Sequence, residues 1–274
     1  MPHYGWEDII RCYGCTDGIP LYLKQFKSER APFENIEDNF LKRDALLYNE
    51  AEILLKQEFR DTANYFSILK AISFSNTKYG EIISYTGIEK SIISKYLQNL
   101  ETARIIKREY PVTDRKEKRK NMSFVFTDNY FRFWFRFVYP NKTTIEKGES
   151  RAVLDSIEKS YDSYLGFVFE GFAREMLWTI KPFKFMKAGR WWHKDKEIDI
   201  IALDEESRTI GFFECKWGSL KENEARKVLE NLSEKSKSVE WNNDSRKEYF
   251  GIFARKILGK EKIRKKGFFD LDDF

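Results

Sequence analysis

The sequence has few of the residues that build redox and zinc sites. Its 274 residues include three cysteines and two histidines. A sparse and odd set of cysteines is typical of a reducing compartment, and we expect the protein in the cytoplasm. Cys12 and Cys15 form the motif CYGC, but a zinc site needs about two more ligands near them. Two small buried residues on a helix explain this motif better than a metal or redox site.

Long apolar runs are also missing. No stretch approaches the roughly 18 apolar residues of a membrane span, and the first residues lack the basic and apolar regions of a secretory signal. We therefore expect no membrane contact. The pattern GxxxxGK[ST] is absent as well, so we expect no ATP site and no ATP hydrolysis by this chain on its own.

The composition is that of a folded protein with a mild basic excess. A hydrophobic content of 42% and a charged content of 34% fit cores covered by a charged surface. The length allows two or three modest domains. The net charge of +5, from 49 basic and 44 acidic residues, permits a nucleic-acid partner but does not require one.

The N-terminal half is predicted to be helical. Residues 1–60 form a helical region in which Pro20 stands near the start of a helix, where its missing N–H is harmless. Apolar residues recur at helical spacing from Phe40 to Leu55. Residues 61–140 predict three helices, two strands and an aromatic helix. Three helices followed by a two-stranded hairpin describe a winged helix-turn-helix.

The predicted third helix and the hairpin tip carry polar and basic side chains. In DNA-binding domains of this kind the third helix enters the major groove, and basic side chains contact phosphates. A second hypothesis stays open, because winged helices also serve as protein–protein modules and charged loops are commonly just solvated. The candidate nucleic-acid-binding residues are Lys90, Ser91, Ser94, Lys95, Arg115, Lys116, Lys118, Arg119 and Lys120.

The segment FRFWFRFVYPN is dense in aromatic residues interleaved with two arginines. Stacking on single-stranded bases is one explanation. Packing explains the segment better, because Phe131, Trp134 and Phe135 fit one face of a helix.

Residues 141–158 are a predicted connector, and residues 159–274 a predicted α/β domain. Its order is αβββαβ, and its first helix carries Glu170. The link DEESR is too short for a crossover helix, so strands two and three are antiparallel. A capping box of Ser219 and Glu222 is expected to open the next helix, and a basic helix to follow the fourth strand. The fold class is thus mixed and multi-domain, with an all-α N-terminal region, a winged helix and an α/β domain with a mixed sheet.

Acidic residues stand inside two of the predicted strands, EIDIIAL and TIGFFECKW. Side chains alternate along a strand, so Glu197 and Asp199 share a face, as do Glu214 and Lys216. An ion-paired hairpin edge would explain any one of these residues. If the hairpin aligns the two faces, Asp199 and Glu214 can share Mg²⁺ or Mn²⁺, which prefer oxygen ligands. The ion would polarise a phosphate and activate water, and Lys216 would stabilise the growing negative charge.

The motifs EID and ECK, joined by a short turn and preceded by a helix with Glu170, resemble those of the PD-(D/E)XK nuclease superfamily, which has the restriction-endonuclease-like fold. The resemblance implies that Asp199 and Glu214 are metal ligands. It also implies that Lys216 is the catalytic lysine and that Glu170 is the helix carboxylate. The implied activity is magnesium- or manganese-dependent hydrolysis of nucleic acid.

A broader resemblance covers nearly the whole chain. The segments GIPLYL, YTGIEKSIISKYLQNLE, FRFWFRFVYPN and GRWWHKDKEIDIIAL resemble the C-terminal half of the archaeal-type ATPases. These AAA+/STAND-like proteins fuse a P-loop ATPase, a winged helix and a nuclease-like domain. The resemblance implies that residues 1–60 correspond to the ATPase lid, and that the chain is a truncated or split member without the P-loop domain.

Two functions are expected from these observations. The first is a Mg²⁺-dependent nuclease, with DNA as the expected substrate and the winged helix assisting its binding. The alternative is a non-catalytic DNA-binding or regulatory module that is a remnant of a larger ATPase. A separate ATPase subunit and a second copy of the chain stay open as partners.

Overall fold

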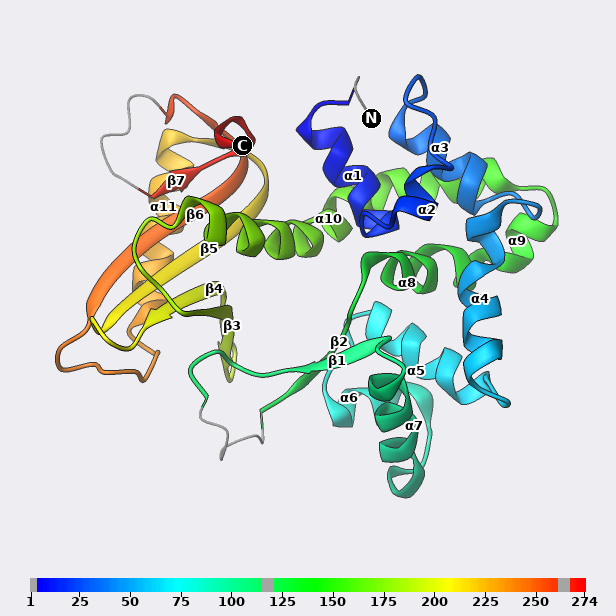
Figure 1. Cartoon of the computed structure of the whole chain (residues 1–274), viewed down its shortest axis with the longest axis horizontal. Coiled ribbons are helices and arrows are strands. Elements are labelled where there is room, and N and C mark those ends of the chain that lie inside the picture. The colour runs from blue at the N-terminus through cyan, green and yellow to red at the C-terminus, as the bar shows by residue number, and fades with distance from the viewer. Residues whose placement is uncertain (1–3, 115–120, 261–266) are drawn as a thin grey trace. The chain divides into compact units, whose positions relative to one another are not determined.

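The computed structural model describes residues 4–114, 121–260 and 267–274 (Figure 1). The chain divides into two compact units, of which unit 1 is Met1–Glu109 with Met122–Tyr161, and unit 2 is Tyr110–Asn121 with Asp162–Phe274. A helical N-terminal region and a mixed sheet confirm the predicted mixed α/β class. No helix within the described ranges is long and apolar enough to cross a membrane.

Unit 1 begins with four helices, and the first of them carries the CYGC motif. Cys12 and Cys15 are buried there, as predicted, and burial raises the pKa of both thiols. Pro20 occupies the first turn of the second helix, also as predicted. The helical spacing from Phe40 to Leu55 is interrupted, because Leu41 leaves the helical backbone conformation. The four helices are α1 (Trp6–Thr16), α2 (Pro20–Leu23), α3 (Pro32–Phe40) and α4 (Leu46–Glu58).

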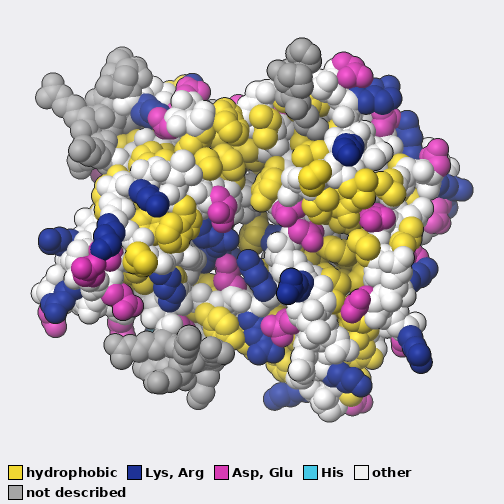
Figure 2. All heavy atoms as spheres, in the orientation of Figure 1, with side chains coloured by type: hydrophobic (Ala, Val, Ile, Leu, Met, Phe, Trp, Pro, Cys, Tyr) yellow, Lys and Arg dark blue, Asp and Glu magenta, His cyan; other side chains and the backbone are white. Residues whose placement is uncertain are grey.

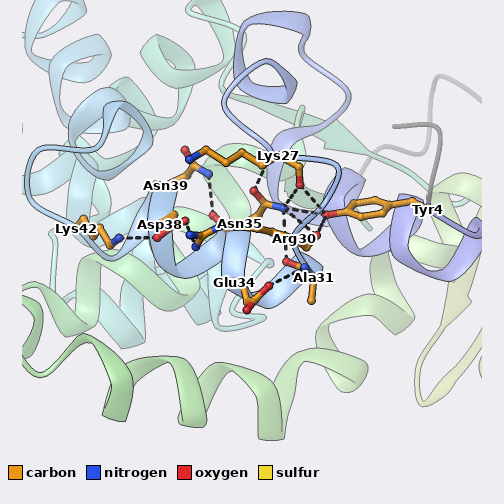
Figure 3. Close-up of polar contacts among 9 residues, drawn as sticks. All are labelled: Tyr4, Lys27, Arg30, Ala31, Glu34, Asn35, Asp38, Asn39 and Lys42. Carbon is orange, nitrogen blue, oxygen red and sulfur yellow. Dashed lines mark hydrogen bonds and ion pairs between the residues drawn. The ribbon is translucent and has the colours of Figure 1, made fainter.

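A buried asparagine closes the turn between α2 and α3 (Figure 3). The Asn35 side chain accepts a hydrogen bond from the Lys27 backbone N–H at 2.8 Å and donates to the Lys27 carbonyl at 2.8 Å. It also donates to the Tyr4 hydroxyl at 2.8 Å. At the start of α3, the Ala31 N–H donates to the Glu34 side chain at 2.9 Å. Because Asn35 is fully buried, these bonds satisfy its amide and fix the turn.

Three helices and a two-stranded hairpin follow, in the predicted order. They are α5 (Ala63–Ser73), α6 (Tyr79–Thr86), α7 (Lys90–Thr102), β1 (Ile106–Glu109) and β2 (Ser123–Phe126). Helix α6 ends at Gly87, whose φ of 68° is a left-handed conformation that glycine adopts at little cost. Strands β1 and β2 are antiparallel, with Ile106 opposite Phe126.

The aromatic segment forms α8 (Asn129–Phe133) and a π-helical turn (Trp134–Val138). Its rings are packed, as predicted. Trp134 is fully buried and donates from its indole nitrogen to the Tyr48 carbonyl at 2.8 Å. Phe135 is fully buried as well. These rings are therefore closed to base stacking.

The predicted connector 141–158 is largely helical. Helix α9 (Lys142–Glu146) lies inside it, and α10 (Ser150–Ile180) begins there and runs from unit 1 into unit 2. The physical reason is the apolar spacing of α10, which extends toward its N-terminus through the buried residues Val153, Leu154 and Ile157.

Unit 2 contains one five-stranded sheet in the order β3-β4-β5-β6-β7. The pairs β3–β4 and β4–β5 are antiparallel, as predicted for the hairpin, whereas the pairs β5–β6 and β6–β7 are parallel. Helix α11 packs on one face and the C-terminal part of α10 lies on the other (Figure 1). The elements are β3 (Lys187–His193), β4 (Lys196–Asp204), β5 (Thr209–Lys221), α11 (Glu222–Ser236), β6 (Lys247–Leu258) and β7 (Phe268–Phe269).

Two sequence predictions concern the ends of these elements, and the first of them is wrong. The capping box is not at Ser219, because β5 continues to Lys221 and Ser219 pairs with β6. The Lys221 N–H instead donates to the Glu224 side chain at 2.8 Å. Strand β6 runs on to Leu258 in parallel pairing with β5 and takes up the start of the segment predicted as a basic helix. Residues 261–266 of that segment lie outside the described ranges.

Candidate functional site

The β4–β5 hairpin opens at the predicted acidic residues. Its ladder ends at the pair Ile200 and Phe213, and the next position of the same register places Asp199 opposite Glu214. There the Cys215 N–H donates to the Asp199 carboxylate at 2.7 Å. Asp199 is 7% exposed and Glu214 is 4% exposed. Two buried carboxylates from adjacent strands therefore stand just beyond the last ladder pair, and the charge of Glu214 acts on Asp199.

Glu214 is held by two lysines. Lys216, two residues along β5, places its ammonium 2.9 Å from one carboxylate oxygen. Lys235, from α11, places its ammonium 2.6 Å from the other oxygen. The sequence predicted Lys216 at this site but gave no sign of Lys235, because the contact depends on how α11 packs on the sheet.

A β-bulge lies beside Asp199 on strand β4. Strand β4 takes three steps from Ile201 to Ile198 where β3 takes two from Gly189 to Trp191, so β4 holds one extra residue. Such a residue interrupts the alternation of side chains. Because the bulge lies between Ile198 and Ile201, alternation alone does not decide whether Glu197 and Asp199 share a face, and this stays a prediction.

Glu170 and Glu197 both pair with Arg190. The Arg190 guanidinium lies 3.3 Å from Glu170 and 3.5 Å from Glu197. The Glu197 side chain is 62% exposed, so it belongs to the surface. Glu170 is 19% exposed and lies on α10. Sequence reasoning missed Arg190, although the position of this arginine on β3 beside an acidic strand was a usable signal.

The electrostatics of the site are dominated by burial and by like charges. Burial, followed by the negative charge of Glu214, raises the pKa of Asp199 to about 6, against the lowering effects of its Cys215 hydrogen bond and Lys216. Burial alone would lower the pKa of Lys216, but the charge of Glu214, the hydrogen bond to Glu214 and the charge of Asp199 together outweigh it and the pKa is raised. Lys216 is therefore an ammonium group at neutral pH.

The pKa of the Cys215 thiol is also affected by these charges. Burial raises the pKa of its thiol, and the charges of Asp199, Glu170 and Glu214 raise it further. The three predicted carboxylates thus act on one buried position of β5. The thiol itself stays protonated and is no nucleophile.

The donor set at Asp199 and Glu214 fits a hard divalent cation. Protein-bound Mg²⁺ commonly has one or two carboxylate ligands and completes its shell with water and phosphate. The pKa of Asp199 is raised first by burial and then by the negative charge of Glu214, and a cation would neutralise that charge. Among the described side chains, no group of three or more His, Cys, Asp and Glu residues is placed to hold a metal together. Glu170, paired with Arg190, therefore stands apart from the two-carboxylate set.

The predicted nucleic-acid-binding residues of α7 lie on its exposed face in unit 1. Lys90, Ser91, Ser94 and Lys95 are all exposed. The Tyr79 hydroxyl shares a hydrogen bond of 2.7 Å with the Ser94 hydroxyl. The hairpin-tip residues lie outside the described ranges, namely Arg115, Lys116, Lys118, Arg119 and Lys120.

Charges of both signs lie on the face of the molecule seen in Figure 2. Figure 2 shows basic and acidic side chains intermixed over the visible face of each unit. The net charge of +5 is therefore not gathered into one basic patch on this face.

Comparisons with known proteins match the region of the site to a family of unknown function. Residues 134–228 match the DUF234 model, described as archaea bacterial proteins of unknown function. The matched range contains Glu170, Asp199, Glu214 and Lys216, and it ends before Lys235. No solved structure matches the chain.

One curated relative aligns with the whole chain. An uncharacterized protein of Methanocaldococcus jannaschii is 39% identical over 283 aligned positions, which cover 100% of this chain and 62% of the relative. The chain thus spans less than two thirds of that protein's length.

Proposed function

We propose that the protein hydrolyses phosphodiester bonds of nucleic acid with the help of Mg²⁺ or Mn²⁺, and that DNA is the substrate. One observation carries this proposal. Asp199 and Glu214 are both buried just beyond the last pair of the β4–β5 ladder, where the charge of Glu214 acts on Asp199, and Lys216 forms an ion pair with Glu214 at 2.9 Å. Two carboxylates and an adjacent lysine suit phosphodiester chemistry.

The element order supports the same proposal. Helix α10, strands β3, β4 and β5, helix α11 and strand β6 follow one another in the order αβββαβ. The PD-(D/E)XK nuclease core, which the motifs EID and ECK resemble, has this order. A bulge beside Asp199 also fits, because bulges are frequent next to active sites.

The roles of the residues follow from their positions. Asp199 and Glu214 would hold the divalent ion, which supplies charge neutralisation and an activated water. Lys216 would contact the attacking water or the phosphate oxygen on which negative charge grows. Arg190 would keep Glu170 and the end of β3 in place through its ion pair at 3.3 Å.

The three helices and the hairpin of unit 1 are proposed to be a winged helix that binds DNA through α7. We expect the double variant Lys90→Gln and Lys95→Gln to bind DNA more weakly, by about the same factor for every DNA sequence. The slope of log K against log salt should fall by about one for each of these lysines that binds a phosphate in the wild type. Fluorescence anisotropy over a salt series measures this slope. An unchanged slope would mean that α7 does not bind DNA, and Lys56→Gln on the exposed side of α4 is the matched control.

Cleavage by the purified protein tests the proposed activity. Duplex DNA, single-stranded DNA, branched DNA and RNA are incubated with the wild-type chain in Mg²⁺, in Mn²⁺ and in EDTA. We expect cleavage of at least one DNA form in either metal and none in EDTA. Cleavage that persists in EDTA, or that the double variant Asp199→Asn and Glu214→Gln retains, would contradict the proposal.

A second candidate function is a non-catalytic DNA-binding or regulatory module. It is favoured by the observation that each acid of the site already has a partner, namely Arg190 for Glu170, two lysines for Glu214 and the Cys215 N–H for Asp199. In this candidate the N-terminal helices resemble an ATPase lid and bind a separate ATPase chain. DNA binding without cleavage of any substrate form would favour it.

A further inference from the structure

Both oxygens of the Glu214 carboxylate are held by lysines. Lys216 lies 2.9 Å from one oxygen, and Lys235 lies 2.6 Å from the other. The Glu214 side chain is only 5% exposed, so little water competes for it. A divalent cation that approaches Glu214 therefore meets an ammonium group at each oxygen.

Lys235 differs from Lys216 in where it comes from. Lys216 is fixed on the same strand as Glu214, whereas Lys235 comes from α11 near its C-terminal end. The Lys235 side chain is 34% exposed. A lysine is a compact charge on a flexible four-carbon stem. Lys235 can therefore leave Glu214 for a neighbouring anion while the helix backbone stays in place.

We propose that Lys235 is an exchangeable counter-ion that couples metal binding to nucleic-acid binding at this site. Without nucleic acid it occupies one oxygen of Glu214 and weakens the binding of a divalent cation. A backbone phosphate of the substrate then draws its ammonium away and opens that oxygen to the ion. This inference rests on the proposed function, because it takes Glu214 as a metal ligand.

The exchange conserves ion pairs. Lys235 gives up a carboxylate and gains a phosphate, and Glu214 gives up an ammonium group and gains a divalent cation. No buried charge is left alone at either stage, which matters because an uncompensated buried charge is costly. By linkage, phosphate binding and metal binding strengthen each other by the same factor. The exchange of Lys235 would keep the occupancy of the metal site low until nucleic acid binds.

The test measures Mn²⁺ affinity by the loss of the free-ion electron paramagnetic resonance signal, so it needs no cleavage. Wild type, Lys235→Gln and Lys235→Met are compared in the full chain, with Lys237→Gln as matched control. Lys237 is nearby but pairs with Glu234 instead of Glu214. We expect both Lys235 variants to bind Mn²⁺ about tenfold more tightly than wild type does. The control Lys237→Gln should bind Mn²⁺ with the wild-type affinity. Melting curves check that each variant is folded.

A reciprocal measurement covers the case in which a Lys235 variant does not fold. The affinity of wild type for a labelled DNA duplex is measured by anisotropy in Ca²⁺ and in EDTA, and Lys235→Arg, which keeps the charge, serves as second variant. We expect Ca²⁺ to tighten DNA binding about tenfold in both proteins.

The outcomes separate the two proposals. Mn²⁺ binding that depends on Glu214 but is unchanged or weaker in Lys235→Gln would overturn the inference and leave the proposed function in place. DNA affinity that is equal in Ca²⁺ and in EDTA for wild type would also overturn the inference. Absence of Mn²⁺ binding in wild type and in every Lys235 variant would overturn the metal-dependent function as well.

Discussion

Replacement of Asp199 by asparagine is expected to abolish metal-dependent cleavage and, at the same time, to stabilise the fold above pH 6. Cleavage is lost because a neutral amide is a poor ligand for a hard cation and half of the carboxylate pair is gone. The hydrogen bond from the Cys215 N–H is kept, because the asparagine oxygen can accept it. The variant thus removes the charge with little change in shape.

The gain in stability follows from the pKa of Asp199. Its folded value of about 6 lies above its ordinary value of 3.8, chiefly because of burial. The folded state therefore binds the proton more tightly, and the cost of ionising Asp199 is absent below about pH 4, grows between pH 4 and 6 and is complete above pH 6. Asparagine never incurs this cost, so the free energy of unfolding should rise by about 1–3 kcal/mol at pH 8 and be unchanged near pH 4.

Urea unfolding at the two pH values measures this difference. Asp204→Asn on the same strand is the matched control, because a hydrogen bond from the Ser207 hydroxyl lowers the pKa of Asp204 and its charge stabilises the fold. The control should lose stability at pH 8. A loss of stability at pH 8 in Asp199→Asn as well would contradict this account, because it would show that the charge of Asp199 stabilises the fold.

Replacement of Lys216 by methionine is expected to lower the cleavage rate about 100- to 1000-fold while Mn²⁺ binding is kept or tightened. The lysine holds a positive charge beside Glu214, and removal of one such group costs stabilisation of the charge that grows in the transition state. It is not expected to ligate the metal, because an ammonium has no lone pair to donate. Loss of rate with retained binding is therefore the signature of a catalytic lysine.

Single-turnover cleavage and Mn²⁺ titration of the same preparation measure both effects. Lys221→Met, on an exposed position of the same strand, is the control and should cleave like wild type. A Lys216 variant that cuts at the wild-type rate would remove this residue from the mechanism. A variant that loses Mn²⁺ binding to the same degree as cleavage would assign Lys216 a structural role instead.

The strand pairing of the site could be predicted because its signals are local. The five-residue link between the second and third strands of unit 2 forced a hairpin, and alternation then brought Asp199 and Glu214 to matching positions. The burial of the aromatic helix could likewise be predicted from the spacing of its rings. The start of α2 could be predicted from Pro20. Such features depend on neighbours close in sequence.

What could not be predicted depends on tertiary packing. The extra residue of β4 beside Asp199 has no marker in the segment EIDII, and it interrupts the alternation on which the face prediction depended. Lys235 reaches Glu214 only because α11 returns over the sheet, 21 residues further along the chain. The capping box failed at Ser219 because parallel pairing with β6 prolonged β5, which no local pattern reveals.

All of these expectations depend on one claim, that Asp199 and Glu214 bind a divalent ion between them. A crystal of the wild-type chain soaked in saturating MnCl₂, with data collected above the manganese absorption edge, tests it directly. We expect an anomalous difference peak about 2.1–2.2 Å from an oxygen of each carboxylate, with Lys235 moved away from Glu214. A map without a peak there, in which both lysines still contact Glu214, would contradict the claim.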